Sequence, residues 1–366
     1  MQTTPDKLFG GLIMRLIQKE NLSRDEARDA FSLILQDRTT AMQQGAFLAA
    51  LAAKGETADE VAGSWEAIYE LDTVKVPAGE FPVLVENSGT GMDSFKTFNI
   101  STAASLLAAA GGVPMARHGA RAITSVCGTV DMAETLGVDV ECPVDVVAGS
   151  IRRAGIGLFN GMSPQTHPLA LGRILSQTHF GSTLNIAASL ANPALPQIAV
   201  RGVYAPGMIG PVIEVMRAIG YRRAIVLHGA IDATDKGMDE ASVCGVTHCA
   251  ELSRTGKITT YTFRPEDFGL KTYAASELQP EPQIEDEAHR FVALMRACEN
   301  GARSRAAILN AALIYYVAGR TDSIAGGVTL ATDAFETGKG FEVLQNWVQN
   351  QTTDPGKALA TLEKWV

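Results

Sequence analysis

The stretch VENSGTGMDSFKTFNIST at residues 85 to 102 contains residue types that could bind a phosphorylated ligand. Gly89 and Gly91 have no Cβ, so backbone N–H groups of this loop can approach a phosphate closely. Further along, Asn99 opens an alanine-rich run, where the free N–H groups of a helix N-terminus would carry partial positive charge. Together these two features predict a cradle for an anionic, phosphate-bearing ligand.

Asp93 lies between the two features and indicates a metal ion. A carboxylate beside a polyphosphate is repulsive unless a divalent cation bridges them. The stretch lacks the third glycine of a dinucleotide-binding fingerprint, because Ser94 stands at that position, and it lacks the GK[ST] of a P-loop. The alternative interpretation is a tight turn between a strand and an ordinary capped helix.

Length and composition limit the class of protein. The 366 residues, 46% of them hydrophobic, can bury a large core, and the length suggests two domains. The formal net charge of -9 argues against a nucleic-acid-binding protein, which would attract phosphate with Lys and Arg. No apolar run reaches the roughly 18 residues of a membrane span and no secretion signal is recognisable, so we expect a cytoplasmic protein. Five cysteines without a CxxC pair predict neither disulfides nor structural zinc.

Two kinds of segment would position the phosphate-binding residues. Residues 6 to 71 have apolar residues at helical spacing, and Ser23 and Thr57, each followed three residues later by glutamate, indicate helix starts. From Phe81 onward, short β-rich runs alternate with alanine-rich helical runs, which favours a parallel sheet. We therefore predict an α/β protein in which a small all-helical domain accompanies a larger α/β domain with a mainly parallel sheet.

The predicted domains interleave along the chain. Residues 1–72 form the first part of the helical domain, and residues 160–190, which again have a helical pattern, return to it. The α/β domain takes residues 73–159, with the phosphate-binding loop, and residues 191–366. The polar, acidic stretch at 273 to 288 is expected to form a surface loop.

Several stretches, taken in chain order, resemble motifs of the anthranilate phosphoribosyltransferase family. The opening stretch is similar to that family's GTGGD and NIST motifs. Residues 116 to 138 (ARHGARAITSVCGTVDMAETLGV) are similar to its KHGNR, SS and GSAD-LE motifs. QQGAFLAALAAKGETADEVAG at 43 to 63 resembles its helical-domain signature, and SPQTHP at 163 to 168 its APxxHP. GMDEASVCGVTHCAEL at 237 to 252 resembles its GLDE and AEL motifs. The resemblance implies a fold like that of nucleoside phosphorylases and phosphoribosyltransferases.

The resemblance also implies a reaction, in which an aromatic amine or nucleobase-like acceptor displaces pyrophosphate from phosphoribosyl pyrophosphate (PRPP) with the help of Mg. The implied PRPP-binding residues are Gly89, Thr90, Gly91, Asp93, Asn99, Ser101, Thr102, Arg117, Gly119 and Ser125. The implied metal-binding residues are Asp239, Glu240 and Ser101. The implied acceptor-pocket residues are His118, Ala120, His167, Leu175 and Gln177. No residue is assigned as a nucleophile or acid–base catalyst.

The acceptor side departs from the family's pattern. Ala120 replaces the asparagine of KHGN, and neither of two arginines expected near the anthranilate carboxylate is present. In one alignment these two positions fall on Gln177 and Thr183, and in the other on Leu175 and Gly181. Loss of a charge-assisted pair to a carboxylate removes about 1.5–3 kcal/mol of binding free energy. The residues therefore predict that anthranilate is a poor acceptor, unless Arg173 or Arg121 replaces the missing charge.

Two other functions stay open from the sequence. One is a non-catalytic binding protein on the same scaffold, and the other is a nucleoside-phosphorylase-like enzyme that holds free phosphate in the same cradle. The acidic pair Asp239–Glu240 favours PRPP, because free phosphate has less need of a metal held by two carboxylates. A homodimer through the helical domain is also expected, since segments such as LFGGLIMRLI at 8 to 17 offer more apolar surface than a small unit can bury.

Overall fold

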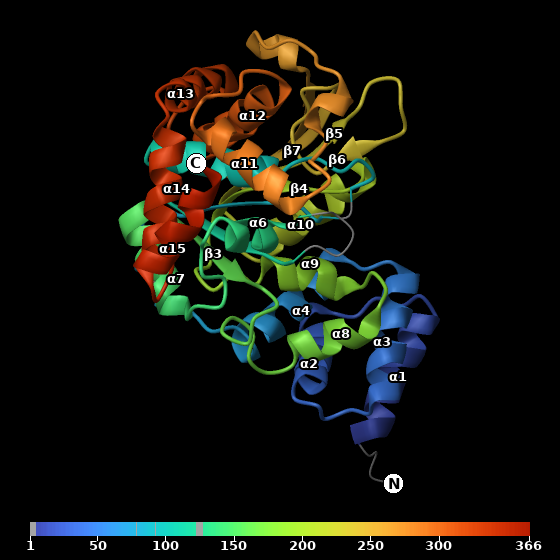
Figure 1. Ribbon diagram of the computed structural model, residues 1–366. Coiled ribbons are helices and arrows are strands. Elements are labelled where there is room, and N and C mark those ends of the chain that lie inside the picture. Colours follow the sequence, from blue (N-terminus) through green and yellow to red (C-terminus); the bar gives the residue numbers. More distant parts are fainter. Residues whose placement is uncertain (1–4, 78, 92, 122–126) are drawn as a thin grey trace.

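The computed structural model describes residues 5–77, 79–91, 93–121 and 127–366, which form a small helical unit beside a larger α/β unit (Figure 1). The helices of the small unit are α1 (Pro5–Ile17), α2 (Arg24–Leu35), α3 (Ala41–Lys54), α4 (Ala58–Leu71), α8 (Leu171–Thr178) and α9 (Thr183–Leu190). Segments far apart in the sequence thus lie side by side, because α9 packs against α4 and α3. The residue boundaries predicted for the two domains stay a prediction.

A single mixed sheet forms the centre of the larger unit. Its strands are β1 (Val85–Ser88), β2 (Met115–Gly119), β3 (Ile156–Asn160), β4 (Ile198–Gly202), β5 (Arg223–Ala230), β6 (Gly237–Met238), β7 (Thr247–Leu252) and β8 (Ile258–Phe263). The strand order is β3-β2-β1-β4-β5-β7-β8, with β6 paired to β5. The first five strands pair in parallel and the remaining ones antiparallel. The predicted fold class, a small helical domain with a mainly parallel α/β domain, is confirmed.

Helices cover both faces of the sheet. The helices of the larger unit are α5 (Ile100–Ala110), α6 (Thr129–Thr135), α7 (Val144–Ala154), α10 (Ile209–Ala218), α11 (Ile284–Met295), α12 (Ala302–Val317), α13 (Ile324–Glu336), α14 (Lys339–Asn350) and α15 (Pro355–Leu362). Alternate residues of a strand point to opposite faces, so Val200 joins the core with α5 and α12, whereas Ala199 joins the core of α10 and the helical unit. One face of the sheet therefore shares a core with the small unit.

Local sequence signals account for several helix boundaries. Ser23 and Thr57 cap α2 and α4, each in a reciprocal capping box with the glutamate three residues later, as predicted. The predicted surface loop at 273 to 288 is wrong at its end, because α11 begins at Ile284. Three acidic residues in the first turn of α11 stabilise the positive end of its helix dipole, so the charge that suggested a loop instead favours a helix start.

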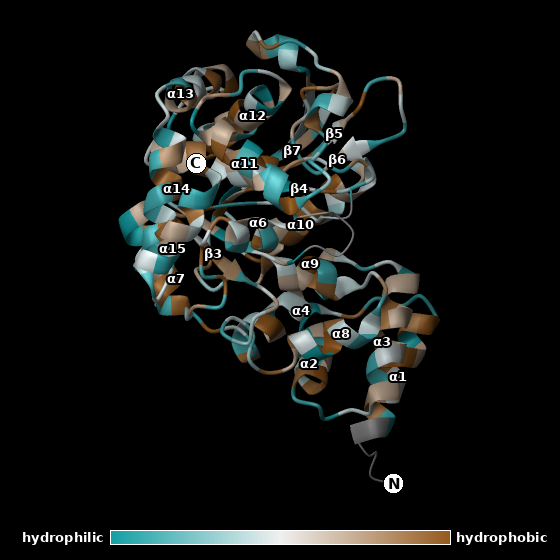
Figure 2. Cartoon of the chain, viewed as in Figure 1, coloured by the Kyte–Doolittle hydropathy of each residue, from teal (hydrophilic) through white to brown (hydrophobic). Residues whose placement is uncertain are grey.

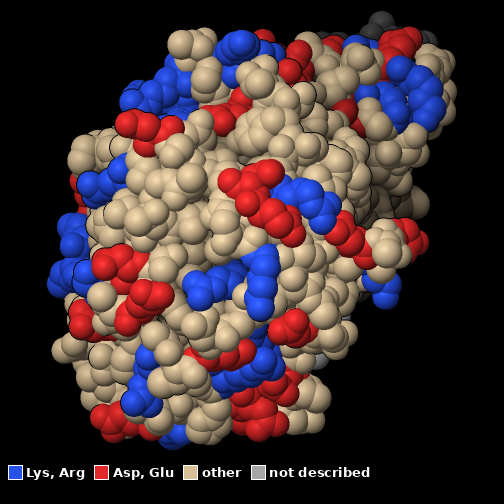
Figure 3. Space-filling view, turned by 90° about the horizontal axis from the view of Figure 1, so that it is seen from above, with Lys and Arg blue, Asp and Glu red and all other residues tan. Residues whose placement is uncertain are grey.

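The outer surface is mixed in character. Figure 2 shows apolar and hydrophilic segments alternating along the helices of both units, as expected for helices that bury one side. On the face seen in Figure 3, Lys and Arg side chains lie among Asp and Glu side chains and do not gather into one basic stripe. Within the described ranges, every helix is too short or too polar to cross a membrane.

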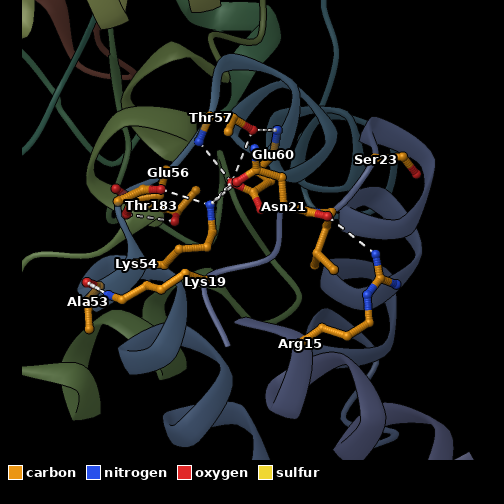
Figure 4. Close-up of polar contacts among 12 residues, drawn as sticks. Arg15, Lys19, Asn21, Ser23, Ala53, Lys54, Glu56, Thr57, Glu60 and Thr183 are labelled. Carbon is orange, nitrogen blue, oxygen red and sulfur yellow. Dashed lines mark hydrogen bonds and ion pairs between the residues drawn. The ribbon is translucent and has the colours of Figure 1, made fainter. Parts of the chain in front are cut away.

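A buried ion pair connects three segments of the helical unit (Figure 4). The side chains of Lys54 and Glu60 are 3% and 0% exposed, and their charged atoms lie 2.8 Å apart. Glu60 also accepts hydrogen bonds from the backbone N–H groups of Leu22 and Thr57, both at 2.8 Å. Lys54 donates to Asn21 Oδ1 at 2.9 Å and to the Gly55 carbonyl at 2.8 Å. The pair therefore holds the start of α2 and the α3–α4 turn together.

We predict that Lys54→Met lowers the free energy of unfolding by about 3–5 kcal/mol, because it leaves a buried carboxylate without its counter-charge. Lys54→Met combined with Glu60→Gln should lower it less than the single substitution, since no buried charge then remains. Denaturant titration of both variants measures the difference. As a control, Arg28→Met removes exposed ion pairs with Asp25 and Asp29 and should lower the free energy of unfolding far less. An equal loss for the buried and exposed pairs would contradict the prediction.

Candidate active site

A cleft of about 120 Å³ opens at the carboxyl ends of the parallel strands, where ligands bind in open α/β sheets. Loops after β1 and β6 and the N-termini of α5 and α6 form its walls. The described residues that line it are Gly89, Gly91, Asp93, Lys96, Thr97, Phe98, Asn99, Ser101, Thr102, Cys127, Gly128, Thr129, Asp239 and Glu240. Residues that the sequence analysis assigned to PRPP and to the metal thus lie in one cleft, although they are far apart in the chain.

The glycine loop is shaped around Asp239. Asp239 Oδ2 accepts a hydrogen bond from the backbone N–H of Gly91 at 2.7 Å and one from Thr90 Oγ1 at 3.4 Å. Gly91 has φ +71°, which side-chain-bearing residues rarely adopt. A Cβ at Gly89 would overlap with the Asp239 carboxylate. Glycine is therefore required at position 89 by the close approach of Asp239 and is favoured at position 91 by the positive φ.

Two further glycines, which the sequence analysis missed, bring the acidic pair onto the sheet. A Cβ at Gly202, the last residue of β4, would overlap with the backbone carbonyl of Asp239. A Cβ at Gly229 of β5 would overlap with the carbonyl of Glu240. The backbone of the acidic pair therefore lies directly against the ends of two neighbouring strands. No local motif marks these glycines, because their partners are distant in the chain.

Three carboxylates converge in the cleft. Oxygen atoms of Asp93, Asp239 and Glu240 all lie within 4.8 Å of one another, and all three residues are buried. Burial, with the neighbouring carboxylates, raises the pKa of Glu240 well above its usual range. Burial and the charge of Asp239 raise the pKa of Asp93 to about 6, although Lys96 opposes the shift. Like charges so close together favour a site that a cation neutralises.

The donor set of this carboxylate cluster fits Mg. Carboxylate oxygens are the hard ligands that Mg prefers. Ser101 Oγ donates to Glu240 Oε1 at 3.2 Å, whereas buried Glu240 Oε2 has no hydrogen-bond partner among the described residues. The role of Ser101 at a metal stays a prediction. Asp93, which the sequence analysis gave to PRPP, belongs to the same cluster. Lys96 Nζ pairs with Asp93 Oδ1 at 3.0 Å and is a cleft residue that the sequence analysis missed.

Arg117 lies beneath the cleft and does not line it. Its buried guanidinium donates to Thr102 Oγ1 at 2.6 Å and to Thr129 Oγ1 at 3.5 Å, and Nε donates to the Asn87 carbonyl at 3.3 Å. Burial lowers the pKa of Arg117 to about 10, so it stays charged at neutral pH. In this arrangement Arg117 positions the hydroxyls at the N-termini of α5 and α6 and adds positive charge behind the cleft.

Gly119 and Ser125 were also assigned to PRPP. Gly119 ends β2, where a Cβ would lie 3.2 Å from Thr129 Cγ2, so glycine allows α6 to approach the strand closely. Ser125 lies outside the described residues.

His118 and His167, both assigned to the acceptor pocket, lie together. Their Nε2 atoms are 3.4 Å apart, while His118 Nδ1 contacts the Ser189 carbonyl at 3.3 Å and His167 Nδ1 the Asp72 carbonyl at 2.7 Å. Because a carbonyl oxygen only accepts, we assign the proton of each ring to Nδ1, which leaves both Nε2 atoms as acceptors. Burial lowers the pKa of His118 to about 3 and also lowers that of His167, so both are neutral at pH 7. Two ring nitrogens that both accept hydrogen bonds suit a ligand with an N–H group.

The other residues assigned to the acceptor pocket lie apart from the cleft. Ala120 is exposed in the loop after β2, Leu175 packs against the core of the helical unit, and Gln177 is exposed on α8. The two arginines considered as replacements are engaged elsewhere. Arg173 contacts Gln44 and Asp37 on the helical unit, and Arg121 contacts Asp131 and Glu134.

Comparison with known proteins finds full-length similarity. The helical bundle domain of the glycosyl transferase family matches residues 11–71, and the a/b domain of that family matches residues 82–341. Anthranilate phosphoribosyltransferase of Methanothermobacter marburgensis is 33% identical, over 93% of this chain and 97% of its own. The enzyme of the same name from an Anaeromyxobacter species is 35% identical, over 92% and 96% of the two chains.

Solved structures agree in fold. The crystal structure of anthranilate phosphoribosyltransferase from Thermus thermophilus has a TM-score of 0.83 at 28% identity, and the match covers 96% of this chain and 99% of that one. The Saccharomyces cerevisiae protein of that name, in complex with PRPP and Mg, has a TM-score of 0.82 at 20% identity, with the same coverage.

We predict that Mg stabilises the protein increasingly as pH rises through about 6, the pKa of Asp93. Because the pKa of Asp93 is raised in the folded protein, the protonated carboxyl stabilises the fold at low pH, and this stabilisation is lost as the pH rises through about 6. A cation bound to the ionised carboxylate would offset the loss. Melting temperatures with and without Mg, from pH 5 to 8, should diverge above pH 6. At neutral pH the gain should reach about 2.7 kcal/mol when free Mg is about 100 times its Kd.

The difference between the two melting curves is the informative quantity, because buried neutral histidines titrate with the opposite sign. Since the pKa values of His118 and His167 are lowered, they stabilise the fold as pH rises, with or without Mg. Asp93→Asn should reduce the divergence. Parallel curves at all pH values would contradict a Mg site at these carboxylates.

Proposed function

Because the chain belongs to the anthranilate phosphoribosyltransferase family of glycosyl transferases, as its motifs predicted, we propose that it transfers the phosphoribosyl group of PRPP to an aromatic amine. The observation that carries the proposal is the convergence of Asp93, Asp239 and Glu240 opposite the glycine loop. A carboxylate cluster beside backbone phosphate donors suits a polyphosphate that arrives with Mg.

Each part of the cleft has a role in this reaction. Backbone N–H groups of the loop around Gly91 and of the α5 N-terminus would hold the phosphates, and the hydroxyls of Ser101 and Thr102 would orient them. Asp93, Asp239 and Glu240 would hold Mg, which would supply positive charge that stabilises the pyrophosphate leaving group. Lys96 and the charge of Arg117 would stabilise the same leaving group. No covalent intermediate with the protein is needed, since positioning and charge are enough.

The acceptor would be an amine of the anthranilate type. The paired Nε2 atoms of His118 and His167 can accept hydrogen bonds from its amino group, so that the nitrogen lone pair points at the sugar. Neutral imidazoles are compatible with this role at pH 7, because they add no charge that would repel the positive centre forming on the sugar. A purely binding protein on this scaffold, or a phosphorylase using free phosphate, would have less need of three converging carboxylates.

We predict that PRPP binds in a calorimetric titration only when Mg is present. Asp239→Asn should weaken PRPP binding at least about tenfold, because one metal ligand loses its charge and the glycine loop loses its acceptor. Asp235→Asn is the matched control, since this exposed residue lies close in sequence and outside the cleft, and it should bind as the unmodified protein does. The absence of binding heat at saturating Mg would rule out the proposed donor.

We also propose a homodimer that pairs the helical units. The exposed sides of α1 and α3 carry apolar residues, including Leu8, 62% exposed, and Met42, 86% exposed. Small residues Gly45, Ala46 and Ala49 continue the exposed side of α3 and would permit close helix packing. Covering such a surface with a second copy removes apolar area from water. We also propose a cytoplasmic location, as the sequence predicts.

Light scattering at micromolar concentration should therefore give twice the mass of one chain. Met14→Glu places a charge in the exposed side of α1 and should shift the mass to that of a monomer, because burying an unpaired carboxylate is costly. Leu330→Glu, on the exposed side of α13, is the control and should remain dimeric. A monomeric mass for the unmodified protein would refute this proposal.

A further inference from the structure

Lys96 is the one cationic residue among the described residues that line the cleft. Its ammonium lies 3.0 Å from Asp93 Oδ1 and donates to the Gly91 carbonyl at 3.3 Å. The side chain of Asp93 is 8% exposed, whereas that of Lys96 is 30% exposed. Lys96 thus pairs with a buried carboxylate of the cluster, while part of its own side chain stays in contact with solvent.

The backbone on both sides of Lys96 is anchored to distant segments. The N–H of Phe95 donates to the Gly237 carbonyl at 3.1 Å, and the N–H of Phe98 donates to the Leu278 carbonyl at 3.0 Å. Within the described ranges, the only hydrogen bonds of the Lys96 side chain are the two inside the cleft. A lysine stem is flexible, and its ammonium has three rotatable donors. The ammonium can therefore change partners within the cleft without a movement of the loop.

The ammonium balances only part of the carboxylate cluster. Asp93, Asp239 and Glu240 have oxygen atoms within 4.8 Å of one another. Within the described ranges, no basic side chain lies within 4.0 Å of a carboxylate oxygen of Asp239 or Glu240. The Lys96–Asp93 contact is thus the one ion pair of a cluster that has three carboxyl groups.

Lys96 and a divalent cation would compete for Asp93. A cation held by all three carboxylates would lie close to Asp93 Oδ1, the atom that the ammonium contacts, and two cations repel each other at short range. Lys96 would therefore weaken the metal site of the free protein. A pyrophosphate group in the cleft would change this balance, because its oxygen atoms can accept from the ammonium as well as contact the metal.

We propose that Lys96 is a tethered counter-ion that exchanges partners: it pairs with Asp93 in the empty cleft and with the pyrophosphate group of PRPP when the carboxylates hold Mg. The inference rests on the proposed phosphoribosyl transfer and assigns to Lys96 the control of metal uptake. Lys96 lowers the affinity for Mg alone and raises the affinity for PRPP in the presence of Mg. The cleft thereby takes up the metal together with PRPP, and each ligand strengthens the binding of the other.

Calorimetric titrations of Lys96→Met separate the two roles of the ammonium. With Mg alone, the variant should bind about 3- to 10-fold more tightly than the unmodified protein, because the competing charge is gone. With PRPP at saturating Mg, it should bind about 3- to 10-fold more weakly, because the pyrophosphate group loses a charged donor. A purely structural role of Lys96 would instead weaken both.

Two further variants serve as controls. Lys96→Arg retains a positive charge and should stay closer to the unmodified protein in both titrations than Lys96→Met does. Lys236→Met removes the same charge from an exposed residue that lies three positions before Asp239 and outside the lining of the cleft, and it should change neither affinity. An equal shift of Mg affinity in Lys236→Met and Lys96→Met would overturn the inference, since net charge alone would then explain the effect.

The titration with Mg alone separates this inference from the proposed function, because it needs no PRPP. The proposed function fails if the unmodified protein binds no PRPP at saturating Mg. The exchange of partners is overturned if the unmodified protein binds PRPP but Lys96→Met does not tighten Mg binding, or does not weaken PRPP binding. Melting temperatures show whether each variant is folded. Should Lys96→Met not fold, the same two titrations of Lys96→Gln decide.

Discussion

The close contact between an acidic loop and the ends of three neighbouring strands organises the cleft of this protein. Gly89 follows β1, Gly202 ends β4 and Gly229 is the second-last residue of β5. A side chain on any of these glycines would overlap with Asp239 or Glu240. The contact brings two carboxylates next to Asp93 and places an Asp239 oxygen on the N–H of Gly91. Mutual repulsion and burial make this arrangement unfavourable without a cation, so the backbone packing that creates the site also makes it need a metal.

The alternation of side chains along β1 and β2 directs neighbouring residues to opposite faces of the sheet. Asn87 and Arg117 point toward α5, where they bond to the backbone and a hydroxyl of its first turn and thereby support the N-terminal end of that helix. Ser88 and His118, each the next residue along, point to the opposite face, toward α9 and the helical unit. The two-residue period of a strand thus places the residues assigned to PRPP and those assigned to the acceptor on the two sides of one sheet.

Buried charges have different partners in the two units, and the difference reflects their roles. In the helical unit, the Lys54–Glu60 pair has its own counter-charge and additional hydrogen bonds, which suits a purely structural contact. In the cleft, the buried Glu240 Oε2 atom has no hydrogen-bond partner among the described residues. Unsatisfied buried groups cost stability, and they are tolerated where a ligand completes them.

The sequence by itself determined the features that residues close together in the chain create. The capping boxes at Ser23 and Thr57, the glycine loop and the acidic pair were all readable because each motif spans only a few residues. Alternating β-rich and helical runs likewise determined the fold class. Ordered motifs also led to the family, since they survive along most of the chain.

Only the tertiary structure decided which distant residues meet. Gly202 and Gly229 matter because β4 and β5 are neighbours beneath the acidic loop, and strand order cannot be read from a local pattern. Arg201 lies on a strand far from α8, where the sequence comparison looked for a positive charge, and it contacts Ser88 because β4 pairs with β1. Leu175 and Gln177 were assigned to the acceptor pocket but lie apart from the cleft. The packing of α8 directs Leu175 toward the core of the helical unit and Gln177 toward solvent. Local chemistry is encoded residue by residue, whereas the position of a charge relative to a substrate is set by contacts across the whole sheet.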